Sequence, residues 1–381
     1  MGESGFAKAI REARIAGRRL IDLTVSNPTV CGFDYDAEAI LGPLANVGAL
    51  TYDPDPRGMR SAREAVAGYY RDLGNLGADV DADAIVLTTS TSEGYGYLFR
   101  LLCDAGDEVL VAQPSYPLFD FLADLEDVRL RSYPLFYDEG WWIDFAELEK
   151  RIGPRTKAIV VVHPNNPTGH ATGVGERRRL EAICVQHGLA LIVDEVFLDY
   201  PLGEEKLTSF TIGPHPVLTF CLSGMSKVAG LPQMKVGWVT VLGPEGIRSE
   251  AMGRLEVIAD TFLSMNAPVQ GALPGWLAGR KRIQGQILER VRGNLGLAQG
   301  SGVEVLRVAA GWSAILRLPQ VSEGGAAEGL LREVGVVVHP GSFYGIAESG
   351  RVVVSLLGPE GEFREGLERI VHGQNLNQGS Y

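Results

Sequence analysis

The sequence predicts an α/β protein: a three-layer sandwich around a mainly parallel seven-stranded sheet, with a smaller α+β domain built from both chain ends. Two observations predict the sheet. Between about residues 84 and 242 lie seven short apolar runs, most of them rich in Val and Ile and without polar alternation, as in strands buried on both faces. Helical stretches separate several of these runs, which indicates parallel strands covered by helices on both sides.

The predicted elements follow one another along the chain. The seven runs are AIVLT, EVLVA, VRLRSY, KAIVVVH, LALIVDE, VLTFCL and VGWVTV. EGYGYLFRLLCDAG is a helical stretch before the second run, and GERRRLEAICVQHG is another before the fifth. After the seventh run, RIQGQILERVRGNLGLAQ reads as a long helix, and the strand-like segments WSAILRLP, VGVVVHP and RVVVSLL follow it. This second block indicates a smaller α+β unit.

These patterns divide the chain into four parts. Residues 1–45 are too few for a domain and include a turn-rich stretch, so we expect them to pack on the small domain. Residues 46–280 form the large domain and residues 281–372 the small C-terminal domain. Residues 373–381 are expected to be a flexible polar tail.

Composition and charge exclude several classes of protein. The 381 residues are 45% hydrophobic and 22% charged, as in a folded globular protein. The formal net charge is -12 and no local basic face is evident, so a nucleic-acid partner is not expected. Four cysteines without a CxxC pair favour a reducing compartment, and no apolar run approaches the roughly 18 residues of a membrane span. We therefore expect a cytoplasmic protein with no membrane partner, and the histidines show no metal-ligand spacing.

Polar residues cluster where five of the predicted strands end. In an open α/β sheet, ligands bind beyond the carboxyl ends of the strands, so these clusters form the candidate site. The clusters are residues 88–93, 113–116, 163–169, 194–195 and 223–227.

LSGMSKVAGLPQMKVGW places Lys227 in a Ser- and Gly-rich loop between two apolar strands. A lysine in such a loop can form a Schiff base if its amine is desolvated, although an exposed surface lysine is the ordinary alternative. The stretch resembles the lysine signature of class I/II pyridoxal-phosphate-dependent aminotransferases, which have fold type I. The resemblance implies that Lys227 carries pyridoxal 5'-phosphate as an aldimine and that Lys235, where the family usually has arginine, binds the phosphate. Gly224 stands where many members have a phosphate-binding serine; Ser223 or Ser226 would compensate, and Ser226 is included among the candidate ligands.

Two further motifs follow buried strands. HPNNPTG is by itself only a turn, but it matches the family's Asn-Pro-Thr-Gly turn. The match implies that Asn166 binds the cofactor's phenolic oxygen and adjoins the substrate, with a cis bond to Pro167. LALIVDE ends in two acids, which need a partner at a buried strand end; a salt bridge or helix cap is the alternative. The resemblance makes Asp194 catalytic, because a carboxylate at the pyridine nitrogen keeps that nitrogen protonated.

Phe197 departs from the family pattern. Three residues after the aspartate, the family usually has a tyrosine that donates a hydrogen bond to the phenolic oxygen. Phenylalanine at this cofactor-contacting position removes that bond. We therefore expect the aldimine to keep its proton to higher pH than it does in members with the tyrosine.

TTSTSEG places three hydroxyl residues just before a predicted helix, where free N–H groups and the helix dipole favour a phosphate. A capping box formed by Ser90 and Glu93 is an equally good local interpretation. The stretch resembles the family's phosphate cup, which assigns Ser90, Thr91 and Ser92 to the phosphate.

Two tyrosines also match family positions. Tyr116 stands where an aromatic ring stacks on the pyridine ring of the cofactor, although core packing is its alternative. Tyr52 matches the tyrosine that members lend to the neighbouring subunit's phosphate. This match implies a homodimer with shared active sites.

Arg351 opens RVVVSLL, shortly after a Pro-Gly-Ser turn that also matches the family. An arginine fork suits a planar carboxylate, so the resemblance makes Arg351 the substrate's carboxylate ligand; a surface strand arginine is the alternative. Asn27, where the resemblance begins, is a further candidate substrate ligand beside Asn166. Val25, Phe33 and Tyr35 are candidates for an apolar substrate pocket.

The matching motifs run from about Asn27 to Arg351 in the family's order. They imply an aminotransferase that moves the amino group of an α-amino acid to a 2-oxo acid, with Lys227 also moving a proton at the substrate's Cα. A pyridoxal-phosphate-dependent lyase or decarboxylase on the same scaffold remains an alternative, because the cofactor supports several reactions. A non-catalytic binder with the same fold is the other.

Overall fold

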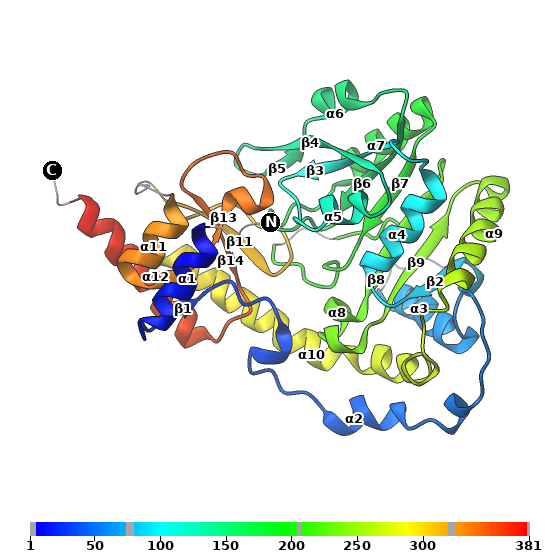
Figure 1. Cartoon of the computed structure of the whole chain (residues 1–381), viewed down its shortest axis with the longest axis horizontal. Helices are drawn as coiled ribbons and strands as arrows, with labels where there is room; N and C mark the ends of the chain where they lie inside the picture. The colour runs from blue at the N-terminus through cyan, green and yellow to red at the C-terminus, as the bar shows by residue number, and fades with distance from the viewer. Residues whose placement is uncertain (1–4, 74–79, 204–206, 319–324, 379–381) are drawn as a thin grey trace.

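The computed structural model describes residues 5–73, 80–203, 207–318 and 325–378, and its centre is one large sheet (Figure 1). The sheet has eight strands in the described part of the chain. In spatial order they are β2 (Ile85–Thr88), β9 (Gly237–Leu242), β8 (Thr219–Gly224), β7 (Ala190–Asp194), β6 (Thr156–Val162), β3 (Glu108–Gln113), β4 (Arg129–Tyr137) and β5 (Trp141–Ile143).

The pairing within this sheet is mainly parallel, as predicted. β8, β7, β6, β3 and β4 form four consecutive parallel pairs, whereas β9 and β5 run antiparallel to their neighbours. The seven predicted runs all form strands. The eighth strand, β5, was not predicted, because three residues with two tryptophans show no periodicity.

Helices cover both faces of the sheet and complete the predicted three layers. Alternate residues of β3 show this: Val109 and Val111 pack with α4 (Thr91–Leu102), α5 (Phe119–Asp124) and α9 (Glu245–Phe262). Leu110 and Ala112 face the other way and pack with α6 (Phe145–Arg151) and α7 (Val174–His187). At the β2 edge, α3 (Arg60–Asp72) packs on β2 and against α10 (Ala267–Gly300), the long helix that leads to the small domain (Figure 1).

The small domain contains residues from both ends of the chain, as predicted. Its antiparallel sheet has the order β10 (Glu304–Val305), β11 (Ser313–Arg317), β14 (Arg351–Ser355) and β13 (His339–Pro340). β1 (Ile21–Asp22) pairs in parallel with β12 (Val336–Val337), which hydrogen-bonds the N-terminal segment to this domain. The remaining helices of the domain are α1 (Gly5–Ile15), α11 (Ala326–Val334) and α12 (Glu360–Gln378).

The segment expected to be a flexible tail is largely helical. α12 continues through Gln378, and residues 379–381 lie outside the described residues. Gly373 is buried, and a Cβ placed on it would lie 3.0 Å from Cγ1 of Val334 on α11. This contact between α12 and α11 was not visible in the polar sequence of the tail.

Short helices connect the larger elements. They are η1 (Pro28–Val30), α2 (Ala37–Leu41), η2 (Gly42–Leu44), η3 (Val47–Leu50), η4 (Ala82–Ala84), α8 (Met225–Val228), η5 (Pro232–Met234) and η6 (Gly341–Tyr344). In the described ranges, no helix combines the length and the apolar character that a membrane crossing requires.

Candidate active site

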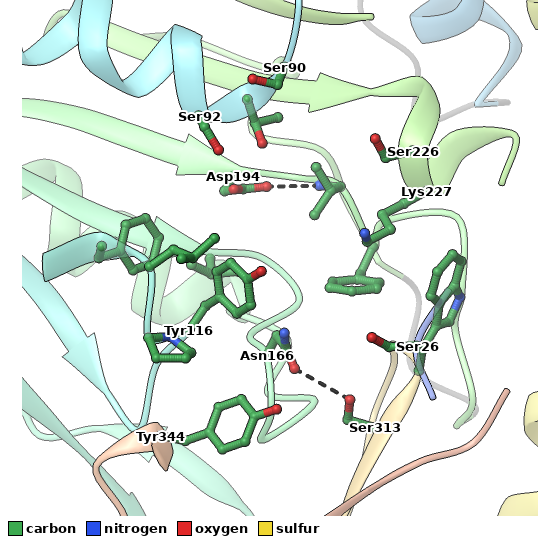
Figure 2. A pocket seen from close by; sticks show the side chains of 18 of the residues that line it. Ser26, Ser90, Ser92, Tyr116, Asn166, Asp194, Ser226, Lys227, Ser313 and Tyr344 are labelled. Atoms are coloured by element: carbon green, nitrogen blue, oxygen red, sulfur yellow. Dashed lines mark hydrogen bonds between the residues drawn. The ribbon is translucent and has the colours of Figure 1, made fainter. Parts of the chain in front are cut away.

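A cavity of about 490 Å³ lies between the carboxyl ends of the large sheet's strands and the small domain (Figure 2). The N-terminal segment contributes Thr24 and Ser26 to its wall, and β11 contributes Ser313. The structure brings most of the predicted cofactor residues together here. Those that line the cavity are Ser90, Thr91, Ser92, Tyr116, Asn166, Asp194, Phe197, Ser226, Lys227 and Lys235.

Lys227 lies on α8, directly after β8, and its amine has two aromatic neighbours. Nζ is 5.9 Å from the ring centre of Phe197 and 5.6 Å from that of Trp312. Burial lowers the pKa of Lys227, and the Asp194 carboxylate opposes this shift. A desolvated amine of this kind carries more of the neutral, nucleophilic form at neutral pH.

Asp194 is the last residue of β7 and is held by two hydrogen bonds. Its carboxylate accepts from the Tyr95 hydroxyl at 3.1 Å and from the backbone N–H of Val196 at 3.1 Å. Burial raises the pKa of Asp194 to about 6, while these donors and Lys227 act in the opposite direction. A buried acid of this kind is stabilised in its charged form by a cationic partner in the cavity.

The first turn of α4 supplies the phosphate end of the cavity. Ser90 caps this helix: its Oγ accepts from the Glu93 N–H at 3.2 Å, while the Glu93 carboxylate accepts from the Thr89 N–H at 2.7 Å. The two local interpretations of this stretch are therefore compatible, because Ser90 caps the helix and also lines the cavity. The side chains of Thr91 and Ser92, with the free N–H groups of the first turn, remain for an anion.

Two close backbone approaches shape this end of the cavity. A Cβ on Gly237 would lie 2.8 Å from the carbonyl carbon of Ser90, and one on Gly224 would lie 2.8 Å from the Val236 oxygen. The sheet therefore approaches the α4 terminus more closely than other residue types permit. Ser226 and Lys235 complete the lining beside it.

Asn166 lies on the opposite side of the cavity, in the loop after β6 (Figure 2). Its bond to Pro167 is cis, as expected. Ser313 donates a hydrogen bond to Asn166 Oδ1 at 3.4 Å, and Figure 2 shows Tyr116 and Tyr344 among the residues that line the cavity with Asn166. This side combines hydroxyl and amide groups from both domains.

Arg351, the predicted carboxylate ligand, does not line the cavity. Its guanidinium lies over the Tyr137 ring, 5.9 Å from the ring centre, with Nη2 3.5 Å from Glu348 Oε1. Side chains two residues apart on a strand share a face, and the next two on this face, Val353 and Ser355, do line the cavity. Arg351 therefore lies at the start of β14, beyond the part of the strand that borders the cavity.

Two other expectations differ from the structure. Asn27 caps η1 by accepting from the Thr29 N–H, and it does not line the cavity. Tyr52, which is expected at the neighbouring subunit's phosphate, is 79% exposed and lines a separate hollow with residues 263–268 and Gln270. The apolar candidates pack into the core instead of lining the cavity: these are Val25, Phe33 and Tyr35.

Sequence reasoning missed several residues of the wall. Trp312 opens a predicted strand, and His339 ends an apolar run immediately before the Pro-Gly-Ser turn. A polar residue at the end of an apolar run was the signal that identified Asp194, and it was available for His339 as well. Ser26 and Tyr344 carried no comparable signal.

The residues present fit the implied cofactor. A phosphate suits the α4 terminus with Lys235, a protonated pyridine nitrogen suits the buried Asp194, and an aldehyde suits the desolvated Lys227 amine. The three groups line one cavity, as a single molecule with these three functions requires.

The sequence of this chain is similar to those of known proteins. The family model for aminotransferase class I and II matches residues 37–370. The glutamate-pyruvate aminotransferase AlaA of Haemophilus influenzae is 29% identical over 273 residues, which cover 71% of this chain and 67% of the relative. An alanine aminotransferase of Mycobacterium tuberculosis is 30% identical over 275 residues, which cover 71% of this chain and 63% of the relative. The matched part thus spans about two thirds of these relatives.

Solved structures are similar over nearly the whole chain. An alanine aminotransferase from Pyrococcus furiosus superimposes with a TM-score of 0.87 at 22% identity, covering 98% of both chains. A double mutant of Thermus thermophilus aspartate aminotransferase gives a TM-score of 0.83 at 25% identity, covering 98% of this chain and 97% of that one. These likenesses support the fold.

Proposed function

The chain belongs to the class I and II aminotransferase family, and from this premise we propose that it is a pyridoxal-phosphate-dependent aminotransferase that moves the amino group of an α-amino acid to a 2-oxo acid. The observation that carries the proposal is the presence of Lys227 and Asp194 in one cavity. Burial shifts both of their pKa values, and the hydroxyl-lined end of α4 adjoins them. Perturbed groups that converge in a cavity are typical of a catalytic site.

The cofactor would be held at four points. Thr91, Ser92 and the free N–H groups of α4 would bind its phosphate, together with Ser226 and Lys235. Asp194 would bind the pyridine nitrogen, Tyr116 would stack on the ring, and Asn166 would bind the phenolic oxygen. When bound, the cofactor supplies a ring that withdraws electrons from the substrate's Cα.

Lys227 is the group that moves the proton at that Cα. Its amine would hold the cofactor covalently and would be free once a substrate is bound. The free amine then removes the Cα proton, and its lowered pKa favours this base form near neutral pH. Phe197 and Trp312, both buried beside Nζ, exclude water from this side of the amine.

A homodimer with shared sites is part of the proposal. Tyr52 projects from the chain at 79% exposure, and Val47 and Leu50 in the same segment are 80% and 87% exposed. An exposed apolar stretch of this kind suits a subunit interface, and it would bring Tyr52 to the partner's phosphate. A cytoplasmic location is also proposed; the four described cysteines are all free, as expected in a reducing compartment.

A spectroscopic experiment tests the function. The protein loaded with pyridoxal phosphate is expected to show a visible absorbance band that single amino acids bleach and that pyruvate or 2-oxoglutarate restores. Lys227→Ala is expected to abolish the band and to reduce turnover by roughly 10³-fold or more. Lys150→Ala, at an exposed site on α6, is the matched control and should leave both unchanged. A band that no amino acid alters would contradict transamination.

A further inference from the structure

The cavity contains few positive groups for a substrate's carboxylate. Among the described residues that line it, the basic ones are Lys227, Lys235 and His339, and no arginine of the described chain is among them. The proposed function uses both lysines for the cofactor. His339 is then the basic group that remains for the substrate.

His339 is held in a defined position. It lies on β13 opposite Val353 of β14, which also lines the cavity. Its Nδ1 is 2.9 Å from the Tyr344 hydroxyl. In the tautomer in which Tyr344 donates to Nδ1, the imidazole carries its proton on Nε2, for which the described residues offer no hydrogen-bond partner. A free N–H on a fixed ring is therefore available to a ligand.

Tyr344 is itself fixed against the large domain. Its carbonyl accepts from the Ser115 N–H at 3.0 Å, and the next carbonyl, of Gly345, accepts from Gln113 Nε2 at 3.1 Å. Burial raises the pKa of Tyr344 to about 12, so its hydroxyl keeps the proton that it can donate. Figure 2 places this tyrosine on the Asn166 side of the cavity, away from Ser90 and Ser226 at the phosphate end.

We propose that His339 is the ligand of the substrate's carboxylate and that Tyr344 is its positioning residue. The inference rests on the proposed function and names the residue that binds its substrate's carboxylate. The Nε2–H donates to the carboxylate, and Tyr344 keeps the proton on Nε2 by donating to Nδ1. On β14 it is the uncharged Val353, and not Arg351, that faces the cavity. The histidine on β13 would therefore bind the carboxylate in place of an arginine.

The charges around His339 determine how binding depends on pH. Burial lowers its pKa and Asp22 of β1 raises it; Asp22 is 3.9 Å from Arg14 of α1. β14 places Val353 opposite His339, and η6 presents Tyr344. α11, which also packs on β13, carries the Glu328–Arg332 pair and Glu333.

The imidazole is neutral near pH 7 without ligand, and a carboxylate favours its protonation. Carboxylate affinity should therefore increase as pH falls.

The test uses the cofactor-loaded protein and two probes that lack a removable Cα proton. 2-Aminoisobutyrate has the carboxylate, and 2-aminoisobutyramide has a neutral amide in its place; the change in cofactor absorbance measures the Kd of each from pH 6 to 8.5. His339→Gln is expected to weaken the carboxylate probe by about 10-fold or more and the amide by about 2-fold at most. In this variant, the affinity for the carboxylate probe should also no longer increase as pH falls. Tyr344→Phe should show a smaller loss with the same selectivity.

Controls separate the possible results. His187→Gln, at an exposed site on α7, should match the wild type. If His339→Gln weakens the binding of both probes equally, the His339 assignment is wrong but the proposed function stands. The same conclusion follows if Arg351→Gln, and not His339→Gln, selectively weakens the carboxylate probe. Absence of the Lys227-dependent band before any probe is added would instead remove the proposed function, and this inference with it.

Discussion

Burial shifts the two central groups of the site in opposite directions, because it disfavours the charged form of each. It lowers the pKa of Lys227 and raises that of Asp194 to about 6. The lysine gains nucleophilic character from this shift, whereas the aspartate needs a cation to become fully charged. A protonated pyridine nitrogen would provide that cation, so Lys227 and Asp194 both favour the same cofactor.

The raised pKa of Asp194 predicts a stability cost in the cofactor-free protein. The unfolded carboxyl titrates near 3.8 and the folded one near 6, so the folded state loses stability as pH rises through this window. Asp194→Asn should therefore raise the melting temperature at pH 7.5, by the equivalent of roughly 1–3 kcal/mol, and much less at pH 4. The exposed Asp260→Asn on α9 should show no such difference. An equal rise in melting temperature at both pH values would show that ionisation of Asp194 is not its cause.

Phe197 predicts a second effect at the residue scale. Its buried ring lies 5.9 Å from Lys227 Nζ and supplies no hydroxyl to the cofactor's phenolic oxygen. Phe197→Tyr adds a donor that favours the deprotonated form, so the absorbance titration of the loaded protein should move to lower pH. The exposed Phe136→Tyr on β4 is the control. An unchanged titration in Phe197→Tyr would count against the expected missing hydrogen bond.

The phosphate end depends on how α4 sits on the sheet. Gly94 of α4 faces β8 and β9, where a Cβ would lie 3.0 Å from Leu222 Cδ2 and 3.1 Å from Val239 Cγ2. Gly237 permits the same closeness at the first turn, next to Ser90. Two glycines thus bring the N–H groups of a helix terminus to the edge of the cavity, where they favour an anion.

Gly237→Ala tests this arrangement. The new Cβ would lie 2.8 Å from the Ser90 carbonyl carbon and 3.0 Å from the Thr91 nitrogen, so the terminus of α4 must move. We expect a loss of about 1–3 kcal/mol of stability and roughly 10-fold weaker pyridoxal phosphate binding, measured by melting and by absorbance titration. Gly253→Ala, in an open position on α9, should instead stabilise by about 0.5–1 kcal/mol. Unchanged cofactor affinity in Gly237→Ala would refute the proposed phosphate end.

At the scale of the whole molecule, the cavity exists because two domains meet. The large domain supplies Lys227 and Asp194, and the small domain supplies His339 and Ser313. Hydrogen bonds from Gln113 and Ser115 to residues 344–345 join the two domains beside the cavity. The proposed homodimer would add Tyr52 of a second copy.

Mixing two inactive variants tests the shared site. In a heterodimer of Lys227→Ala and Tyr52→Ala chains, one site carries both substitutions and the other carries neither, if Tyr52 serves the partner. Random exchange of subunits should then restore up to about one quarter of wild-type activity. If Tyr52 serves its own chain, mixing adds nothing to the activity of the separate variants. Light scattering of the unmixed protein should independently give twice the 41.0 kDa chain mass.

The sheet and much of the candidate site were predictable because their signals are local. A strand buried on both faces is a run of apolar residues, and parallel strands bring polar residues such as Asn166, Asp194 and Lys227 to one edge. The three-residue strand β5 and the helical tail were not predictable, since the first is too short for a period and the second depends on contact with α11.

The sequence by itself therefore determined the α/β class, the mainly parallel sheet, and the polar groups at its edge. The tertiary structure alone decided which small-domain residues face the cavity. Arg351 was assigned from its motif, yet its place on β14 leaves Val353 at the cavity, while His339 reaches it from β13. The physical reason is that strand pattern depends on neighbouring residues, whereas the direction of a side chain toward a site depends on how two separately formed domains pack.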